Sequence, residues 1–161
     1  MHWLPGAATH VDLDKEGNSN ALRLTNFEFD IPDDATIDGI EVSLVTTGSD
    51  DPRSMAPVRL TKDGATPIGV PLGRSGSWSG GSVLFGGATE LWNTTWTPEE
   101  LNSSNFGILV NVQGASAGDR FNVYSAEITV HYTPAEDTTP KLEEIVDGLE
   151  LYHAAFYEFP L

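Results

Sequence analysis

The sequence predicts an all-β protein: an antiparallel β-sandwich of the jelly-roll or immunoglobulin-like type with a C-terminal extension. Several short segments alternate apolar and polar residues, which is typical of half-buried strands. Turn residues separate these segments, with 16 glycines and 10 prolines among 161 residues. Only one short stretch before residue 134 carries the signals of a helix. The length fits one sandwich domain.

The alternating segments define seven expected strands. They cover residues 21–29, 37–47, 58–62, 67–72, a short stretch near Val83, 106–112 and 121–132. In the second strand, Ile40, Val42 and Leu44 share the apolar face. In the last strand, the even-numbered residues from 122 to 132 make the better core face.

Turns and loops separate these strands. Pro32 to Asp34 has turn composition, and Asp63-Gly64 is a strong hairpin signal. Residues 1–19 are expected to be a loose start, and the Gly- and Ser-rich stretch 73–90 a long surface loop. Thr97-Pro98-Glu99-Glu100 combines an N-cap, a proline at the first helical position and an acidic first turn, which predicts one helical turn.

The composition changes after Thr133. We expect a sandwich domain at 1–133, a linker at 134–140 and an amphipathic C-terminal arm at 141–161. The arm has helical apolar spacing up to Leu149, and Gly148 can end that helix. Its apolar side chains must pack on the sandwich or on a neighbouring subunit. The predicted partner-binding residues are Leu149, Leu151, Tyr152, Phe156, Tyr157 and Phe159.

The charge of the chain limits its partners. A net charge of −16, from 24 acidic and 8 basic side chains, argues against binding to nucleic acids and to anionic membranes. No apolar run approaches the roughly 20 residues that cross a bilayer, and the first residues do not look like a signal peptide. The absence of cysteine excludes disulfides and thiolate chemistry.

Metal, cofactor and catalytic sites are not expected. Residues 12–17 begin like a calcium loop, but Arg23 stands where the loop needs a carboxylate ligand. The four histidines are scattered, and His131 is expected to be an ordinary surface residue on a strand. No nucleophile elbow joins a strand to a helix. We therefore expect no enzymatic activity.

Three tryptophans have two interpretations. Trp78, Trp92 and Trp96 lie near polar residues and could form a platform on which a sugar ring stacks. Alternatively, Trp92 and Trp96 cap the core of the sandwich, because tryptophan buries a large area while its N–H binds a partner at the rim.

Several blocks resemble a known type of domain. The first block is Phe27-x-Phe29-x-Ile31-Pro32 with Ala35-Thr36-Ile37-x-Gly39-Ile40-x-Val42. The second block is Gly86 to Trp92 with Trp96-Thr97-Pro98 and Leu101-Asn102. The last two blocks are Asn105 to Ile108 and Ala126-x-Ile128-Thr129-Val130-x-Tyr132. Their order and spacing resemble a β-sandwich domain that recurs in virion structural proteins of tailed phages and in phage-derived bacterial surface proteins. The resemblance covers residues 20–133.

The resemblance implies a setting rather than a reaction. It implies a structural protein in a phage particle. The small size of the chain favours the capsid decoration or cement type, and we expect the apolar C-terminal arm to attach it to capsid or tail subunits. In the particle the chain would form a homo-oligomer. The alternative is a carbohydrate- or receptor-binding module of a tail fibre, baseplate or cell surface.

Overall fold

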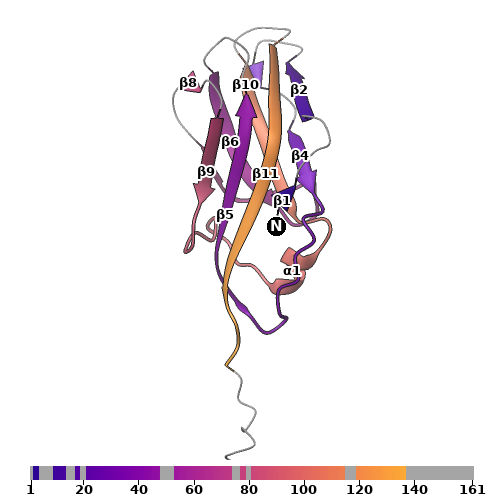
Figure 1. Cartoon of the computed structure of the whole chain (residues 1–161), viewed down its shortest axis with the longest axis vertical. Helices are drawn as coiled ribbons and strands as arrows, with labels where there is room; N and C mark the ends of the chain where they lie inside the picture. Colours follow the sequence, from indigo (N-terminus) through magenta and orange to yellow (C-terminus); the bar gives the residue numbers. More distant parts are fainter. Residues whose placement is uncertain are drawn as a thin grey trace, which may run out of the picture.

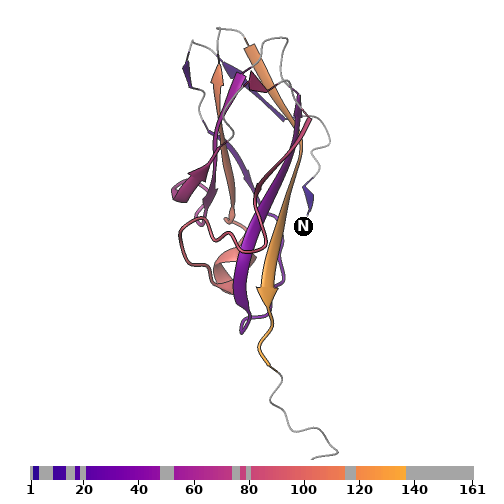
Figure 2. The ribbon, with the colours of Figure 1, turned by 90° about the vertical axis from the view of Figure 1, so that its left-hand side faces the viewer.

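The protein consists of two antiparallel β-sheets that face each other. The computed structural model describes residues 2–3, 9–13, 17–18, 21–47, 53–73, 77–78, 81–114 and 119–136. Figure 1 looks onto one sheet, and Figure 2 shows the two layers edge-on, with the short helix α1 (Pro98–Asn102) near one end. The predicted all-β sandwich is thereby confirmed.

The first sheet is built around β5 and β11. Within the described residues its order is β1-β11-β5-β9, and β2 also pairs with β11. Its strands are β1 (His2–Trp3), β2 (Thr9–Leu13), β5 (Thr36–Thr47), β9 (Gly81–Gly86) and β11 (Asp119–Thr133). The sequence predicted no strand in residues 1–19, but β1 and β2 lie there and extend this sheet.

The second sheet has the order β3-β10-β6-β7 in the described part of the chain, with β4 paired to β10 and β8 to β6. Its strands are β3 (Gly17–Asn18), β4 (Leu22–Thr25), β6 (Arg53–Thr61), β7 (Pro67–Leu72), β8 (Ser77–Trp78) and β10 (Gly107–Gly114). β7 ends this order of strands, and its Pro71 is compatible with an edge position because proline cannot donate a ladder hydrogen bond. The short strand expected near Val83 within the loop at 73–90 is β9, whereas the two-residue strand β8 in the same stretch was not predicted.

The core lies between the two sheets. Ile40, Val42 and Leu44 of β5 are fully buried, as their alternation predicted. Ile108 and Val110 of β10 face them from the other sheet and are also fully buried. Because each such side chain contributes roughly 1.5–3 kcal/mol when fully buried, this double layer supplies most of the driving force for folding.

The first predicted strand ends early. The alternation predicted a strand over 21–29, but β4 stops at Thr25. Asn26 and Glu28 have φ angles of 66° and 56°, in the left-handed region. This turn of the backbone lets Leu24 and Phe27 both enter the core, although a regular strand would place them on opposite faces.

A bulge changes the phase of β11. The even-numbered face predicted for the core holds for Ala126 and Ile128, which are fully buried. It fails at Tyr124, which is 45% exposed, whereas Val123 is fully buried. The pairing with β5 shifts between Val123 and Ser125, and the extra residue exchanges the two faces of the strand.

The predicted hairpin at Asp63-Gly64 forms. It joins β6 to β7 by a loop between Thr61 and Pro67, which pair with each other. The carboxylate of Asp63 accepts hydrogen bonds from the Thr66 hydroxyl at 2.6 Å, the Thr66 and Ala65 N–H groups at 2.7 and 2.8 Å, and the Thr61 hydroxyl at 2.9 Å. These bonds, those from Thr66 first, hold the pKa of Asp63 well below its ordinary value.

Asp63 is expected to make the stability of the hairpin depend on pH. Because its folded-state pKa is lowered, its contribution is present above the unfolded pKa of about 4 and is lost as the pH falls further. Asp63→Asn should therefore lower the urea midpoint at about pH 6, and the difference from the wild type should shrink at about pH 3. The exposed turn variant Asp33→Asn is the control. Equal midpoints for Asp63→Asn and wild type at both pH values would contradict this role.

The short helix is fixed at its start, as predicted. The Thr97 hydroxyl accepts from the Glu100 N–H at 3.3 Å, and the Glu100 carboxylate accepts from the Thr97 N–H at 3.1 Å, which is a capping box. Lys62 at the end of β6 lies 2.6 Å from Glu100 and 5.0 Å from the centre of the Trp96 ring. Burial raises the pKa of Glu100, but the bonds from Lys62 and Thr97 outweigh it and lower the pKa. This cluster ties α1 to the second sheet.

Candidate functional site

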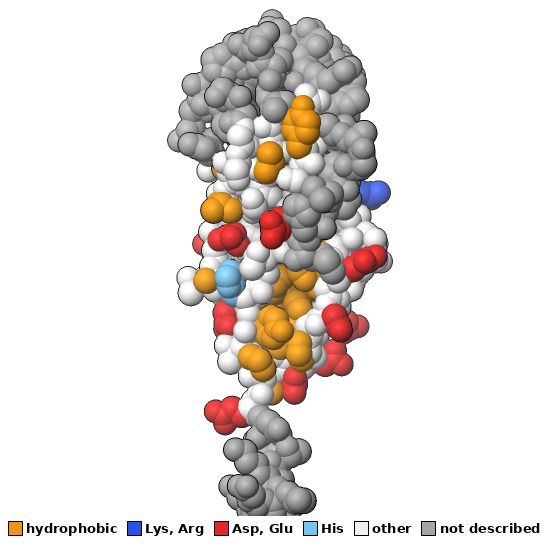
Figure 3. Space-filling view, viewed as in Figure 1, with side chains coloured by type: hydrophobic (Ala, Val, Ile, Leu, Met, Phe, Trp, Pro, Cys, Tyr) orange, Lys and Arg blue, Asp and Glu red, His pale blue; other side chains and the backbone are white. Residues whose placement is uncertain are grey.

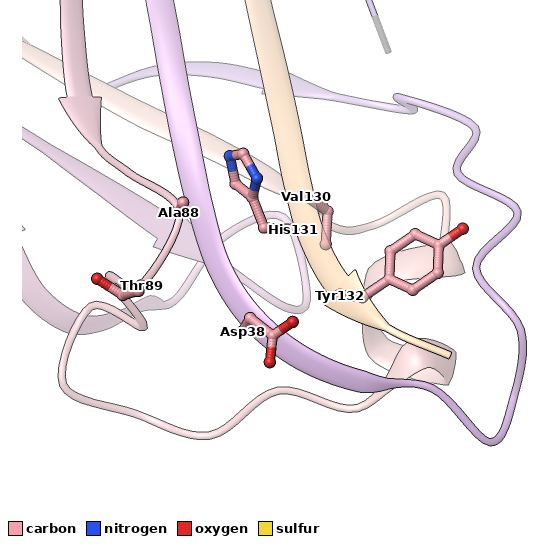
Figure 4. A pocket seen from close by; sticks show the side chains of 6 residues that line it. All are labelled: Asp38, Ala88, Thr89, Val130, His131 and Tyr132. Atoms are coloured by element: carbon pink, nitrogen blue, oxygen red, sulfur yellow. The ribbon is translucent and has the colours of Figure 1, made fainter. Parts of the chain in front are cut away.

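An open pocket lies where β5 begins and β11 ends. It has a volume of about 670 Å³, and Figure 4 shows the side chains that line it. They are Asp38, Ala88, Thr89, Val130, His131 and Tyr132. Three of them come from β11, one from β5 and two from the turn after β9. The pocket therefore joins residues that lie nearly a hundred positions apart in the chain.

A second bulge shapes this pocket. His131 pairs with Gly39, but the next residue, Tyr132, pairs with Ile37, so Asp38 is the extra residue in β5. A bulge redirects the side chain of the extra residue. Here the Asp38 carboxylate accepts a hydrogen bond of 2.8 Å from the Thr133 hydroxyl, which links the ends of the two strands.

The segment after β9 crosses over Gly39. Its backbone is bonded to β5, because the Ile40 N–H donates to the Glu90 carbonyl at 2.9 Å and the Gly87 N–H donates to the Ile40 carbonyl at 3.2 Å. A Cβ atom at Gly39 would lie 2.4 Å from backbone atoms of Gly87 and Ala88. Only glycine fits beneath this crossing.

His131 is more enclosed than the sequence predicted. Its side chain is partly buried, and its Nε2 atom is buried without a hydrogen-bond partner. The expectation of an ordinary surface histidine was therefore wrong, since the bulge and the crossing segment surround it. Figure 4 shows the imidazole pointing away from the Asp38 carboxylate. The two groups do not form the acid–histidine pair that general base catalysis uses.

The described residues offer little metal chemistry. Nowhere among them do three or more His, Asp or Glu side chains come together as a metal site would require. Of the acidic residues that begin like a calcium loop, Asp14 and Glu16 lie outside the described residues. Among the helices that the structure describes, none has the length and apolar character to span a bilayer.

The predicted partner-binding residues lie outside the described part of the chain. Leu149, Leu151, Tyr152, Phe156, Tyr157 and Phe159 all follow Glu136, the last described residue. The structure therefore does not test whether they bind a partner. It does show the point from which the arm departs, because β11 ends at Thr133.

Two of the three tryptophans belong to the core. Trp92 is fully buried and its indole N–H donates to the Ile40 carbonyl at 3.0 Å. Trp96 is 7% exposed and its indole N–H donates to the Leu91 carbonyl at 3.0 Å. Their predicted role as core caps is confirmed. Neither ring offers a face for stacking a sugar, and the side chain of Trp78 lies outside the described residues.

The described part of the chain holds a sandwich with an open pocket, a half-exposed tyrosine and an unpaired imidazole nitrogen. No family model, curated protein or solved structure matches this chain. Its function therefore has to be inferred from its own sheets, pocket and surface.

Sequence reasoning missed Asp38, Ala88 and Thr89 as pocket residues. They carry no motif, because a bulge and a crossing segment bring them to His131 and Tyr132. The one available signal was Gly39, a glycine inside an apolar strand pattern. Such a glycine often marks a bulge or a close approach of another backbone.

Proposed function

We propose that this chain is a non-enzymatic structural protein of a tailed-phage virion, of the capsid-decoration type, attached through its C-terminal arm at residues 141–161. In this role the sandwich faces solvent, and the arm contacts capsid or tail subunits. The proposal rests first on the resemblance of residues 20–133 to virion sandwich domains.

The observation that carries the proposal is the way the resembling blocks bind one another. Asn102 of the second block donates to the Ile31 carbonyl and accepts from the Ile31 N–H, both at 2.9 Å. The Trp92 indole binds the Ile40 carbonyl, and the Asn26 N–H, one residue before the first block, donates to the Ser104 carbonyl at 3.0 Å. Blocks that are separate in sequence thus form one end of the sandwich, as parts of a single structural unit would.

Surface chemistry supports a role in a particle. The net charge of −16 keeps exposed surfaces soluble and mutually repelling. Figure 3 shows acidic side chains around an apolar area on the lower half of one face. The arm adds the six predicted partner-binding residues, all apolar or aromatic, which need a covered location in water. A negatively charged surface that repels other copies, together with an apolar arm for attachment, suits a protein that binds a capsid at a defined site.

Particle association tests the proposal. Density-gradient particles from a culture that produces this chain should contain it in stoichiometric amounts, as measured by mass spectrometry. Full-length protein should also rebind to particles that lack it. The variant with Phe156, Tyr157 and Phe159 all changed to serine should fail to rebind, because its arm has lost its apolar contacts. Particles without the chain, or equal rebinding by the variant, would contradict the proposal.

A carbohydrate-binding role is the second candidate. The observation that favours it is the open pocket, whose lining includes the polar residues Asp38, Thr89 and His131 and also Tyr132, which is 39% exposed. An aromatic face with a few polar groups is the usual composition of a sugar site. Saturable binding on a glycan array that Tyr132→Ala abolishes would establish this function in place of attachment.

A further inference from the structure

One edge of β11 is only partly paired. On the side away from β5, β2 pairs with residues 119–123 and β1 pairs with Ala126 and Glu127. Between Thr129 and Thr133, no strand of the described residues pairs on this side, although β5 continues on the other side to Thr133. Such an edge presents backbone N–H and C=O groups to an added strand.

The inner face of β11 opens along the same stretch. Ala126 and Ile128 are fully buried, Val130 is partly buried, and Tyr132 is 39% exposed. All four have the same phase in the strand, so apolar side chains on the core side become exposed toward its end. Phe29, partly buried, packs at the same end, with its ring 5.9 Å from that of Phe106. Figure 3 shows apolar side chains gathered on this lower part of the face.

An open edge beside exposed apolar side chains suits an extended apolar segment. In β-strand addition the backbone supplies hydrogen bonds and alternate side chains fill pockets. Residues 149–161 have this pattern in part. In an extended chain Leu149, Leu151, Tyr157, Phe159 and Leu161 share one face with His153 and Ala155, whereas Tyr152 and Phe156 lie on the other face with Glu150 and Glu158.

The course of the chain favours a second copy as the acceptor. Residues 134–136 are exposed and continue beyond the end of β11, away from the open edge (Figures 1 and 2). The linker 134–140 begins and ends with proline, and proline favours extended, semi-rigid spacers. We propose that residues 149–161 of one copy add a strand to the Thr129–Thr133 edge of a second copy. This proposal rests on the assembly role of the arm in the proposed function, and it makes a second copy of this chain, rather than a capsid or tail subunit, the partner of residues 149–161.

A matched pair of full-length variants tests the edge. Tyr132→Lys places a charge on the open edge, whereas Tyr124→Lys places it on the opposite face of the same strand, at a similar exposure of 45%. Light scattering after size exclusion should show oligomers for the wild type and Tyr124→Lys. Tyr132→Lys should associate about tenfold more weakly or worse, as expected for loss of a central aromatic contact. Thermal unfolding confirms that both variants fold.

Mixing two defective full-length chains tests donor and acceptor separately. The Tyr132→Lys chain has an intact arm, but its β11 edge should no longer accept a strand. The chain with Tyr157→Asp and Phe159→Asp has an intact edge, but its arm should no longer bind. Each should be largely monomeric alone, and the mixture should form a complex that contains both chains. Because the chain is acidic, association should also strengthen when salt screens the repulsion between copies.

Three results would overturn the proposal: a monomeric wild type, equal association of Tyr132→Lys and Tyr124→Lys, or no complex in the mixture. Failure of the proposed function gives a different pattern. If particles bind the Tyr132→Lys chain normally, the arm attaches to another subunit, and the virion role stands without the β11 edge. If copies associate through the β11 edge but no particle contains the chain, the strand-addition proposal is supported and the virion role is not.

Discussion

Trp92→Ala is expected to destabilise the sandwich by roughly 3–5 kcal/mol, the usual cost of truncating a buried tryptophan. Trp92 is fully buried and fills the end of the core where the resembling blocks meet. Its loss leaves a cavity, and the Ile40 carbonyl loses the indole N–H that binds it at 3.0 Å. Since Ile40 belongs to the central strand β5, the loss of stability should affect both sheets. Urea unfolding followed by fluorescence measures the change.

Trp92→Phe is the matched control. It keeps most of the apolar volume and removes the indole donor, so it should cost less than the alanine variant. A cost of about 1–3 kcal/mol is typical of leaving a buried acceptor unpaired. If Trp92→Ala unfolded at the wild-type urea concentration, Trp92 would not cap the core and the end of the sandwich would need another explanation.

Gly39→Val is also expected to destabilise the sandwich strongly. A Cβ atom at this position would lie 2.4 Å from the backbone of Gly87 and Ala88. Backbone atoms cannot move aside like the end of a flexible side chain, so the crossing segment must lift from β5. Overpacking of this kind costs about 1–3 kcal/mol, and more where the backbone must shift. The pocket around His131 should be disrupted as well, because Ala88 and Thr89 line it.

Ser43→Val is the control that distinguishes the steric clash at Gly39 from the general effect of placing a valine in β5. Ser43 lies on the same strand and the same face as Gly39, four residues further along, and is partly buried. Valine favours strands, so this control should be neutral or slightly stabilising. NMR chemical shifts should change around Ala88 and His131 in Gly39→Val alone. Equal stability of the two variants would contradict the close crossing.

Period-two patterns identified the strands where one face is buried throughout. Ile40, Val42 and Leu44 were predicted as core residues from their spacing, and all three are fully buried. The capping box at Thr97 was also readable, because its signals lie within four consecutive residues. Such features depend on neighbours in the sequence, so the sequence alone is enough to find them.

Features that depend on distant pairing were not predictable. Tyr124 was assigned to the core face, but the bulge before Ser125 places it outside. β1 and β2 were missed because their few residues form strands only by pairing with β11. The pocket was missed for the same reason, since a bulge at Asp38 brings its lining residues together. Apart from Gly39 next to the bulge at Asp38, these register shifts have no local signal in the sequence.

Amide hydrogen exchange along β11 tests the central claim, that the arm covers its open edge. Full-length wild type is compared at high concentration with the full-length Tyr157→Asp and Phe159→Asp variant. We expect the amides of Thr129–Thr133 that point away from β5 to be protected in the wild type and to exchange faster in the variant, whereas amides bonded to β5 keep their protection. Equal exchange at all these positions would show that the edge is not covered by the arm.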